Sequence, residues 1–162
     1  MPESPAPSVA TCLWFQTDPE PAAEFYAGLL PGSSWSVPNR EMLPDGSLGA
    51  AFMAEVVLQG QRLILMNGGP QFKLTPAASI QVHVETQAEI DRLWSALLEG
   101  GSENRCGWLT DRWGVSWQII PRALPRLLAL PDRAAAGRAM QAMMGMVKLD
   151  IAALEAAAAQ KV

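Results

Sequence analysis

The sequence predicts an α+β fold in which two βαβββ modules follow one another and helices complete the chain. Three observations support this prediction: strand-like and helix-like segments occur twice in the same order, both predicted helices follow a Thr-x-x-Glu motif, and the segment after Pro121 has helical periodicity. We expect a flexible tail at residues 1–8, modules at about 9–70 and 78–121 within one domain (9–121), and C-terminal helices at 122–162.

The first module starts with an apolar run, residues 9–16, that is typical of a strand. Thr17 and Glu20 then form a capping motif for a helix that ends at Pro31-Gly32. The apolar face of this helix consists of Ala22, Phe25, Tyr26, Leu29 and Leu30. Strands are expected at 35–37, 48–58 and 62–66, with a polar loop before the second and a hairpin at Gln59-Gly60-Gln61 before the third.

The second module repeats this order. Residues 79–85 alternate, with Ile80, Val82 and Val84 on one face and Ser79, Gln81, His83 and Glu85 on the other, as in a half-buried strand. Thr86 and Glu89 form the second capping motif, and the helix that follows carries Ile90, Leu93, Trp94, Leu97 and Leu98 on its apolar face. The repeat predicts that the two modules share one topology.

A hairpin closes the second module. Residues 106–110 and 115–121 flank Asp111-Arg112-Trp113-Gly114, where the Asp can bond its own turn and the Gly can adopt a positive φ. Helices follow at about 122–130, 132–147 and 150–159, the last capped by Asp150. The helical stripe of Met140, Met143, Met144 and Val147 must cover either its own sheet or a second copy, and we expect a homodimer.

Composition excludes several classes of protein. A net charge of −4 without a cluster of Lys and Arg argues against nucleic-acid binding and against an anionic membrane surface. The sequence shows no secretory signal and no apolar run of about 18 residues, so we expect a cytoplasmic protein without a membrane span. Cys12 and Cys106 lack metal-type spacing and are interpreted as reduced thiols.

The pattern resembles the PhnB-like branch of the vicinal oxygen chelate superfamily, which includes glyoxalases, bleomycin-resistance proteins and extradiol dioxygenases. Three segments carry the resemblance: Cys12-Leu13-Trp14-Phe15, residues 65–73 and residues 106–131. It implies a glyoxalase-like fold and the label 3-demethylubiquinone-9 3-methyltransferase. We do not expect methyltransferase activity, because the connection Gln16-Thr17-Asp18-Pro19-Glu20 lacks the Gly-rich turn of a nucleotide-binding βα unit.

The resemblance also implies a divalent metal held by His, Gln or Glu on the first and last strands of the modules. The corresponding positions are Ala10, Ile64, Ser79 and Gln118, and only Gln118 has a ligand-type side chain. We therefore expect no metal and no other cofactor; a divalent metal would require a different set of ligands.

The same resemblance implies a cup lined by Trp14, Gln81, His83 and Gln118. Asn67, before Gly68-Gly69, is either a turn former or a further ligand contact. Of the remaining tryptophans, Trp94 and Trp117 are expected in the core, whereas Trp108 and Trp113 suit either hairpin packing or a pocket.

Three hypotheses about function remain open. The first is a dimeric protein that binds a small, partly apolar molecule. The second is an enzyme of the isomerase, lyase or dioxygenase type, or one that transfers a proton with His83 as base, the only side chain here with an ordinary pKa near neutrality. The third is a structural or regulatory protein that binds a partner through its Met-rich helices.

Overall fold

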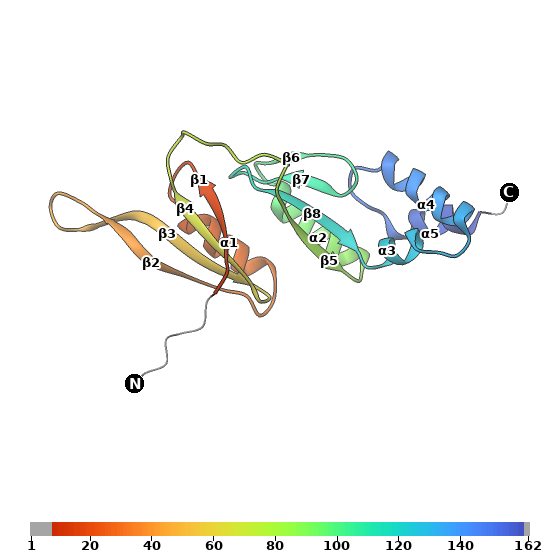
Figure 1. The fold of residues 1–162 in the computed structure, drawn as a ribbon, viewed down its shortest axis with the longest axis horizontal. Coiled ribbons are helices and arrows are strands. Elements are labelled where there is room, and N and C mark those ends of the chain that lie inside the picture. Colours follow the sequence, from red (N-terminus) through yellow and green to blue (C-terminus); the bar gives the residue numbers. More distant parts are fainter. Residues whose placement is uncertain (1–7, 161–162) are drawn as a thin grey trace. The chain divides into compact units, whose positions relative to one another are not determined.

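The chain divides into two compact units, Met1–Leu74 and Thr75–Val162, each built on a four-stranded sheet (Figure 1). The computed structural model describes residues 8–160, so the predicted N-terminal tail lies outside the described residues except for Ser8. Strands and helices occur in both units, and the predicted α+β class with C-terminal helices is confirmed.

Unit 1 contains one helix and one sheet within its described residues. Its elements are β1 (Thr11–Phe15), α1 (Glu20–Leu29), β2 (Ser34–Met42), β3 (Leu48–Leu58) and β4 (Gln61–Asn67). The sheet order is β1-β4-β3-β2, with β1 parallel to β4 and the other pairs antiparallel. This is the predicted βαβββ order, and β3 has the bounds that the sequence indicated.

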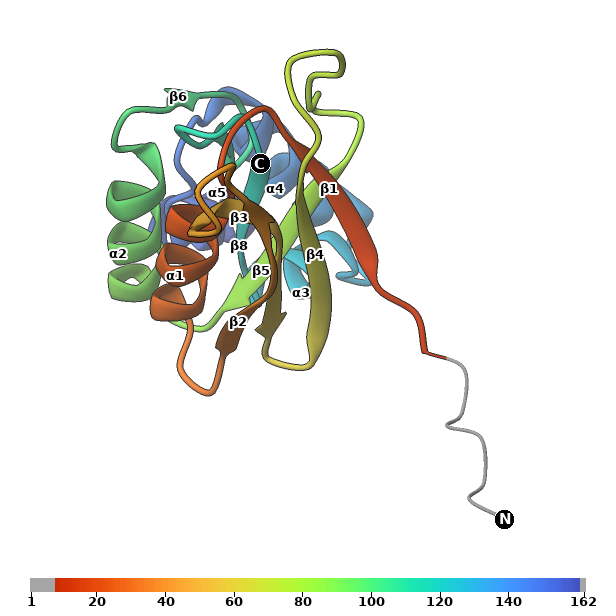
Figure 2. The ribbon, with the colours of Figure 1, turned by 90° about the vertical axis from the view of Figure 1, so that its left-hand side faces the viewer.

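Helix α1 covers one face of this sheet (Figure 2). Tyr26 of α1 packs into a core with Phe15 and Leu65, all of them almost fully buried. Because side chains alternate along a strand, Trp14 lies on the face of β1 opposite to Phe15. The sheet therefore has one face in the core and one face left for other contacts.

Two local predictions in unit 1 were wrong. Thr17 does not cap α1; the backbone N–H of Glu20 donates to Oδ1 of Asp18 at 2.9 Å, and the Glu20 carboxylate binds Arg40 instead of reaching back. Strand β2 continues to Met42, well beyond the predicted residues 35–37. It is an edge strand with many exposed side chains, so it lacks the apolar alternation that reveals a strand.

Unit 2 repeats the order and adds helices. Its elements are β5 (Ser79–Val84), α2 (Gln87–Leu98), β6 (Ser102–Glu103), β7 (Trp108–Thr110), β8 (Ser116–Pro121), α3 (Ala123–Leu128), α4 (Arg133–Gly145) and α5 (Ile151–Ala159). The sheet order is β5-β8-β7-β6, with β5 parallel to β8. The predicted capping box of Thr86 and Glu89 is present at the start of α2, and Trp94 and Trp117 are buried as predicted.

Asp111 organises the hairpin between β7 and β8. Its Oδ1 accepts from the backbone N–H groups of Trp113 and Val115, and its Oδ2 accepts from the Trp117 indole at 2.9 Å. Asp111 is only 4% exposed, and these donors compensate for the burial of its carboxylate. Gly114 has a positive φ and donates to the carbonyl of Asp111, so the predicted turn is confirmed.

The C-terminal helices pack on their own unit. Leu149 and Leu154 form a buried cluster with Ile120 and Leu124, and Met143 and Met146 pack against it. Gln87 of α2 donates to the carbonyl of Leu149 and accepts from the backbone N–H of Ile151, which ties the extension to the sheet domain. Across residues 8–160, no helix has the length and apolar character needed to cross a membrane.

Candidate functional site

The side chains predicted to bind a ligand are divided between the two units. Trp14 and Asn67 belong to unit 1, whereas Gln81, His83 and Gln118 belong to unit 2.

In unit 2, β5 and β8 bring Gln81, His83 and Gln118 together on one face of the sheet. Gln81 and Gln118 are direct partners in the register of the parallel pair. Nε2 of Gln81 donates to Oε1 of Gln118 at 2.8 Å, and Oε1 of Gln81 lies 2.8 Å from Nε2 of His83. The predicted cluster of polar residues thus forms a continuous hydrogen-bonded chain.

With the amide orientations of this network, the hydrogen-bonded chain fits one tautomer of His83. Because Gln81 donates through its nitrogen to Gln118, its oxygen faces the imidazole, and Nε2 of a neutral His83 must carry the proton. Nδ1 is then the basic ring nitrogen. His83 and Gln81 are both exposed, so the arrangement could bind a polar group or accept a proton from a molecule on this face.

The positions implied for a metal do not fit one. Nε2 of Gln118 donates to Oγ of Ser79 at 2.8 Å and its oxygen accepts from Gln81, so the amide serves the sheet's own network. Ala10 and Ile64 have no donor atom. Among residues 8–160, no group of three or more His, Cys, Asp or Glu side chains is placed to hold a metal ion.

Trp14 holds the loop that follows β4. Its Nε1 donates to the carbonyl of Gly69 at 2.8 Å, and its ring meets Phe72 edge-on at a centroid distance of 5.0 Å. A Cβ at Gly68 would overlap with the Trp14 ring, so only glycine allows this close approach. The predicted place of Trp14 in the wall of a cup stays a prediction; its observed contacts position Gly68 and Gly69.

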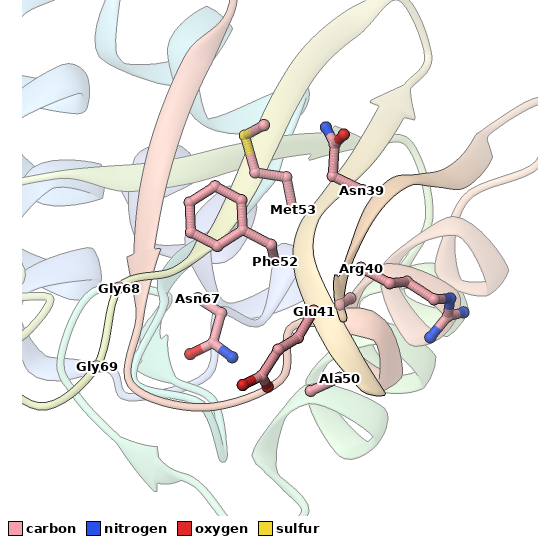
Figure 3. Close-up of a pocket in the computed structure, with 10 residues that line it drawn as sticks. Asn39, Arg40, Glu41, Ala50, Phe52, Met53, Asn67, Gly68 and Gly69 are labelled. Carbon is pink, nitrogen blue, oxygen red and sulfur yellow. The ribbon is translucent and has the colours of Figure 1, made fainter. Parts of the chain in front are cut away.

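Unit 1 has a pocket of about 700 Å³ beside this loop (Figure 3). It is lined by β2, by β3 and by the end of β4 with the loop after it: Asn39, Arg40, Glu41, Ala50, Ala51, Phe52, Met53, Asn67, Gly68 and Gly69. Phe52 lies between Asn67 and Met53, and Glu41 points to the same part of the pocket as Asn67. Asn67 is thus the one predicted ligand residue in this pocket.

Sequence reasoning missed the other lining residues for two reasons. Asn39, Arg40 and Glu41 were assigned to a loop, whereas they belong to β2, whose pairing with β3 has register shifts at Asn39 and Arg40. Phe52 is half exposed at the corresponding irregularity of β3. A large aromatic residue inside a strand gives no sequence signal of whether its side chain faces the core or a pocket.

Of the two charged residues that line the pocket, Arg40 forms an ion pair with Glu20. The guanidinium of Arg40 donates to both carboxylate oxygens of Glu20, at 2.8 and 2.6 Å. Hydrogen bonding from Arg40 lowers the pKa of Glu20, so this carboxyl stays ionised over a wider acidic range. Figure 3 shows the Arg40 side chain pointing away from Glu41 and Asn67.

Comparison with known proteins places the chain among relatives of the predicted kind. A family model described as 3-demethylubiquinone-9 3-methyltransferase matches residues 7–120. The structure of the PhnB protein from Bacillus cereus is 30% identical, with 71% of this chain and 99% of that chain covered and a TM-score of 0.64. No curated protein matches the chain.

Two further solved structures share the fold. A protein from Pseudomonas aeruginosa is 25% identical, with 72% of this chain and 98% of that chain covered and a TM-score of 0.55. A hypothetical protein from S. aureus is 18% identical, with 74% and 96% covered and a TM-score of 0.50, which shows the fold alone. The chain therefore belongs to the PhnB-like family, whose model is described as 3-demethylubiquinone-9 3-methyltransferase.

Proposed function

We propose that this protein binds a small, partly apolar molecule in the pocket of unit 1. The observation that carries the proposal is the pocket itself. Its volume of about 700 Å³ lies within the range of small-molecule sites. Phe52 and Met53 provide apolar surface, and the amides of Asn39 and Asn67 provide polar groups that can orient a ligand.

The surrounding structure supports this use of the pocket. Trp14 positions Gly68 and Gly69, so the glycine wall is held by a hydrogen bond and an aromatic contact. Main chain without side chains allows a ligand to approach closely. A wall positioned in advance reduces the conformational entropy that binding must overcome.

Proton transfer by His83 is the second candidate function. The hydrogen bonds from His83 through Gln81 to Gln118 favour it. Because Nε2 of the exposed His83 donates to Gln81, Nδ1 is the basic ring nitrogen. Such a base would abstract a proton from a molecule bound on the sheet face of unit 2.

Methyl transfer is not proposed. The family model's description refers to it, but the connection between β1 and α1 consists of Gln16, Thr17, Asp18 and Pro19. A nucleotide-type methyl donor is ordinarily held by a Gly-rich turn at the carboxyl end of such a strand. The sheet of unit 1 also contains antiparallel pairs where a doubly wound sheet is parallel.

One titration distinguishes the two candidate sites. Phenylbutanol, an alcohol with a flat apolar body, is added to isotope-labelled full-length protein, and amide shifts are followed by NMR. The pocket proposal predicts shifts at Asn67 and Gly69 and roughly tenfold weaker binding in Phe52→Ala, from the lost apolar contact. His83→Gln should bind as wild type does. Leu48→Ala is the control, since it removes an exposed side chain of β3 outside the pocket.

The opposite result would overturn the pocket proposal. Binding that survives Phe52→Ala but disappears in His83→Gln would locate the ligand on unit 2 and support the second candidate. Absence of shifts at the pocket residues at millimolar phenylbutanol would also contradict the proposal.

We further propose that the protein is a homodimer that uses the outer face of α4. Met140 and Met144 of α4, and Val147 just after it, are exposed, whereas Met143 and Met146 pack against the buried cluster of Leu149 and Leu154. Methionine side chains adapt their shape to a partner surface. This apolar face supports association of two copies.

A further inference from the structure

The charged groups that line the unit 1 pocket are Arg40 and Glu41. Both nitrogens at the end of Arg40 are bound to the Glu20 carboxylate, so its positive charge is already balanced. A ligand would gain little from Arg40, since an anion would have to compete with an existing two-point ion pair.

Glu41, the other charged residue of the pocket, has no such ion pair in the described part of the chain. Within residues 8–160 its carboxylate has no hydrogen-bond or ion-pair partner, and its side chain points to the part of the pocket occupied by Asn67. The two charged groups of the pocket are therefore one neutralised cation and one unneutralised anion. The pocket offers a ligand a net negative charge.

The remaining side chains complement a positive charge. The carboxamide oxygens of Asn39 and Asn67 are hydrogen-bond acceptors, and Phe52 presents an aromatic side chain that is 50% exposed. An aromatic face attracts a cation within about 6 Å of its centre. Met53 extends the apolar surface beside Phe52.

We propose that the ligand of this pocket is an organic cation, a primary or secondary ammonium or a guanidinium on a small apolar body. The inference rests on the proposed function and deepens it. The positive group would donate a charge-assisted hydrogen bond to Glu41 and a second hydrogen bond to the carboxamide oxygen of Asn67. The apolar body would pack on Phe52 and Met53. A carboxylate or phosphate of the same size would be repelled by Glu41.

Three probes with the same apolar body test the sign of the charge: phenylbutylamine, phenylbutanol and phenylbutyrate, each titrated into full-length protein. The amine should bind about fivefold more tightly than the alcohol, as expected for one exposed charge pair, and the carboxylate should bind most weakly. Glu41→Gln should remove the advantage of the amine and leave the affinity for the alcohol unchanged. Glu24→Gln is the matched control, because Glu24 is exposed on α1 and does not line the pocket.

The outcomes separate the two proposals. Equal binding of amine and alcohol, with no effect of Glu41→Gln, would overturn the cation inference while supporting the pocket. An equal loss of amine binding in Glu24→Gln and Glu41→Gln would also overturn it, since general surface charge would then explain the preference. If none of the three probes shifts the pocket residues, both proposals are overturned.

Discussion

Gly68 and Trp14 illustrate how one residue without a side chain can determine a local structure. The Trp14 ring occupies the space where a Cβ of residue 68 would lie, and its Nε1 binds the next carbonyl. The sequence Asn67-Gly68-Gly69-Pro70 indicates that a strand ends there, but it gives no sign that a tryptophan from β1 packs on this loop.

Gly68→Ala should lower the free energy of unfolding by about 1–3 kcal/mol, because the added methyl group overpacks against the Trp14 ring. Chemical denaturation of full-length protein measures the loss. Gly28→Ala is the control: no atom lies within 4 Å of its added Cβ, and alanine favours the helix by about 0.5–1 kcal/mol.

A double variant tests the cause. If Trp14 is the obstacle, Trp14→Ala and Gly68→Ala should be strongly coupled, and the alanine at 68 should cost little once the ring is gone. Additive losses would show that the backbone itself, rather than the ring, excludes a side chain at this position.

Helices α1 and α2 carry the same sequence motif and use different caps. At α2 the Thr86 hydroxyl accepts from the Glu89 N–H, and the Glu89 carboxylate accepts from the Thr86 N–H. At α1 the corresponding Glu20 is held by Arg40 of β2. At α1, Asp18 instead of Thr17 accepts a backbone N–H, and the Glu20 carboxylate forms a tertiary ion pair instead of reaching back, which a motif of four residues cannot reveal.

Thr86→Ala should destabilise the protein by about 1 kcal/mol, and Thr17→Ala should have almost no effect, since Thr17 is exposed and caps nothing. The matched threonines make the comparison direct, with thermal or denaturant unfolding as the measurement. A similar loss in both variants would contradict the different caps.

The α2 cap also has a defined pH dependence. The backbone N–H of Thr86, followed by its hydroxyl and the N–H of Glu85, lowers the pKa of Glu89. A lowered pKa in the folded state means that the stabilisation is present above the ordinary value of about 4.3 and is lost as the pH falls through the lower folded value. Glu89→Gln should therefore lack this part of the acid dependence of unfolding.

At the scale of the whole molecule, the C-terminal helices begin just after the residues that the family model matches, which end at 120. The extension belongs to unit 2: Gln87 binds main-chain groups of Leu149 and Ile151, and Lys148 pairs with Asp91 at 2.6 Å. The inner apolar residues of the extension are therefore packed within unit 2, whereas the side chains of Met140 and Met144 are exposed and can contact a partner.

The homodimer proposal predicts that Met144→Lys with Met140→Lys weakens self-association at least about tenfold, because charged side chains would replace apolar contacts at the interface. Sedimentation analysis over a range of concentrations measures it. Met42→Lys is the control, a still more exposed methionine of β2 in the other unit. A monomeric wild-type protein, or equal effects of both substitutions, would contradict an interface on α4.

The sequence by itself determined the family, the order of elements apart from the two-residue strand β6, and the inward faces of α2 and β5. Alternation along 79–84 and helical spacing in α2 follow from burial, which selects apolar residues at every inward position. It also placed Gln81 and His83 on one face, because side chains alternate with a strict period of two.

Only the tertiary structure decided what those residues contact. The hydrogen-bonded side-chain network that links His83, Gln81, Gln118 and Ser79 depends on the register of β5 with β8. The pocket depends on the shifted pairing of β2 with β3, which brings Asn39 and Glu41 near Asn67. Such contacts join residues distant in sequence, and their geometry is set by strand pairing and packing. No local pattern records them, because a local pattern reflects burial and backbone preference alone.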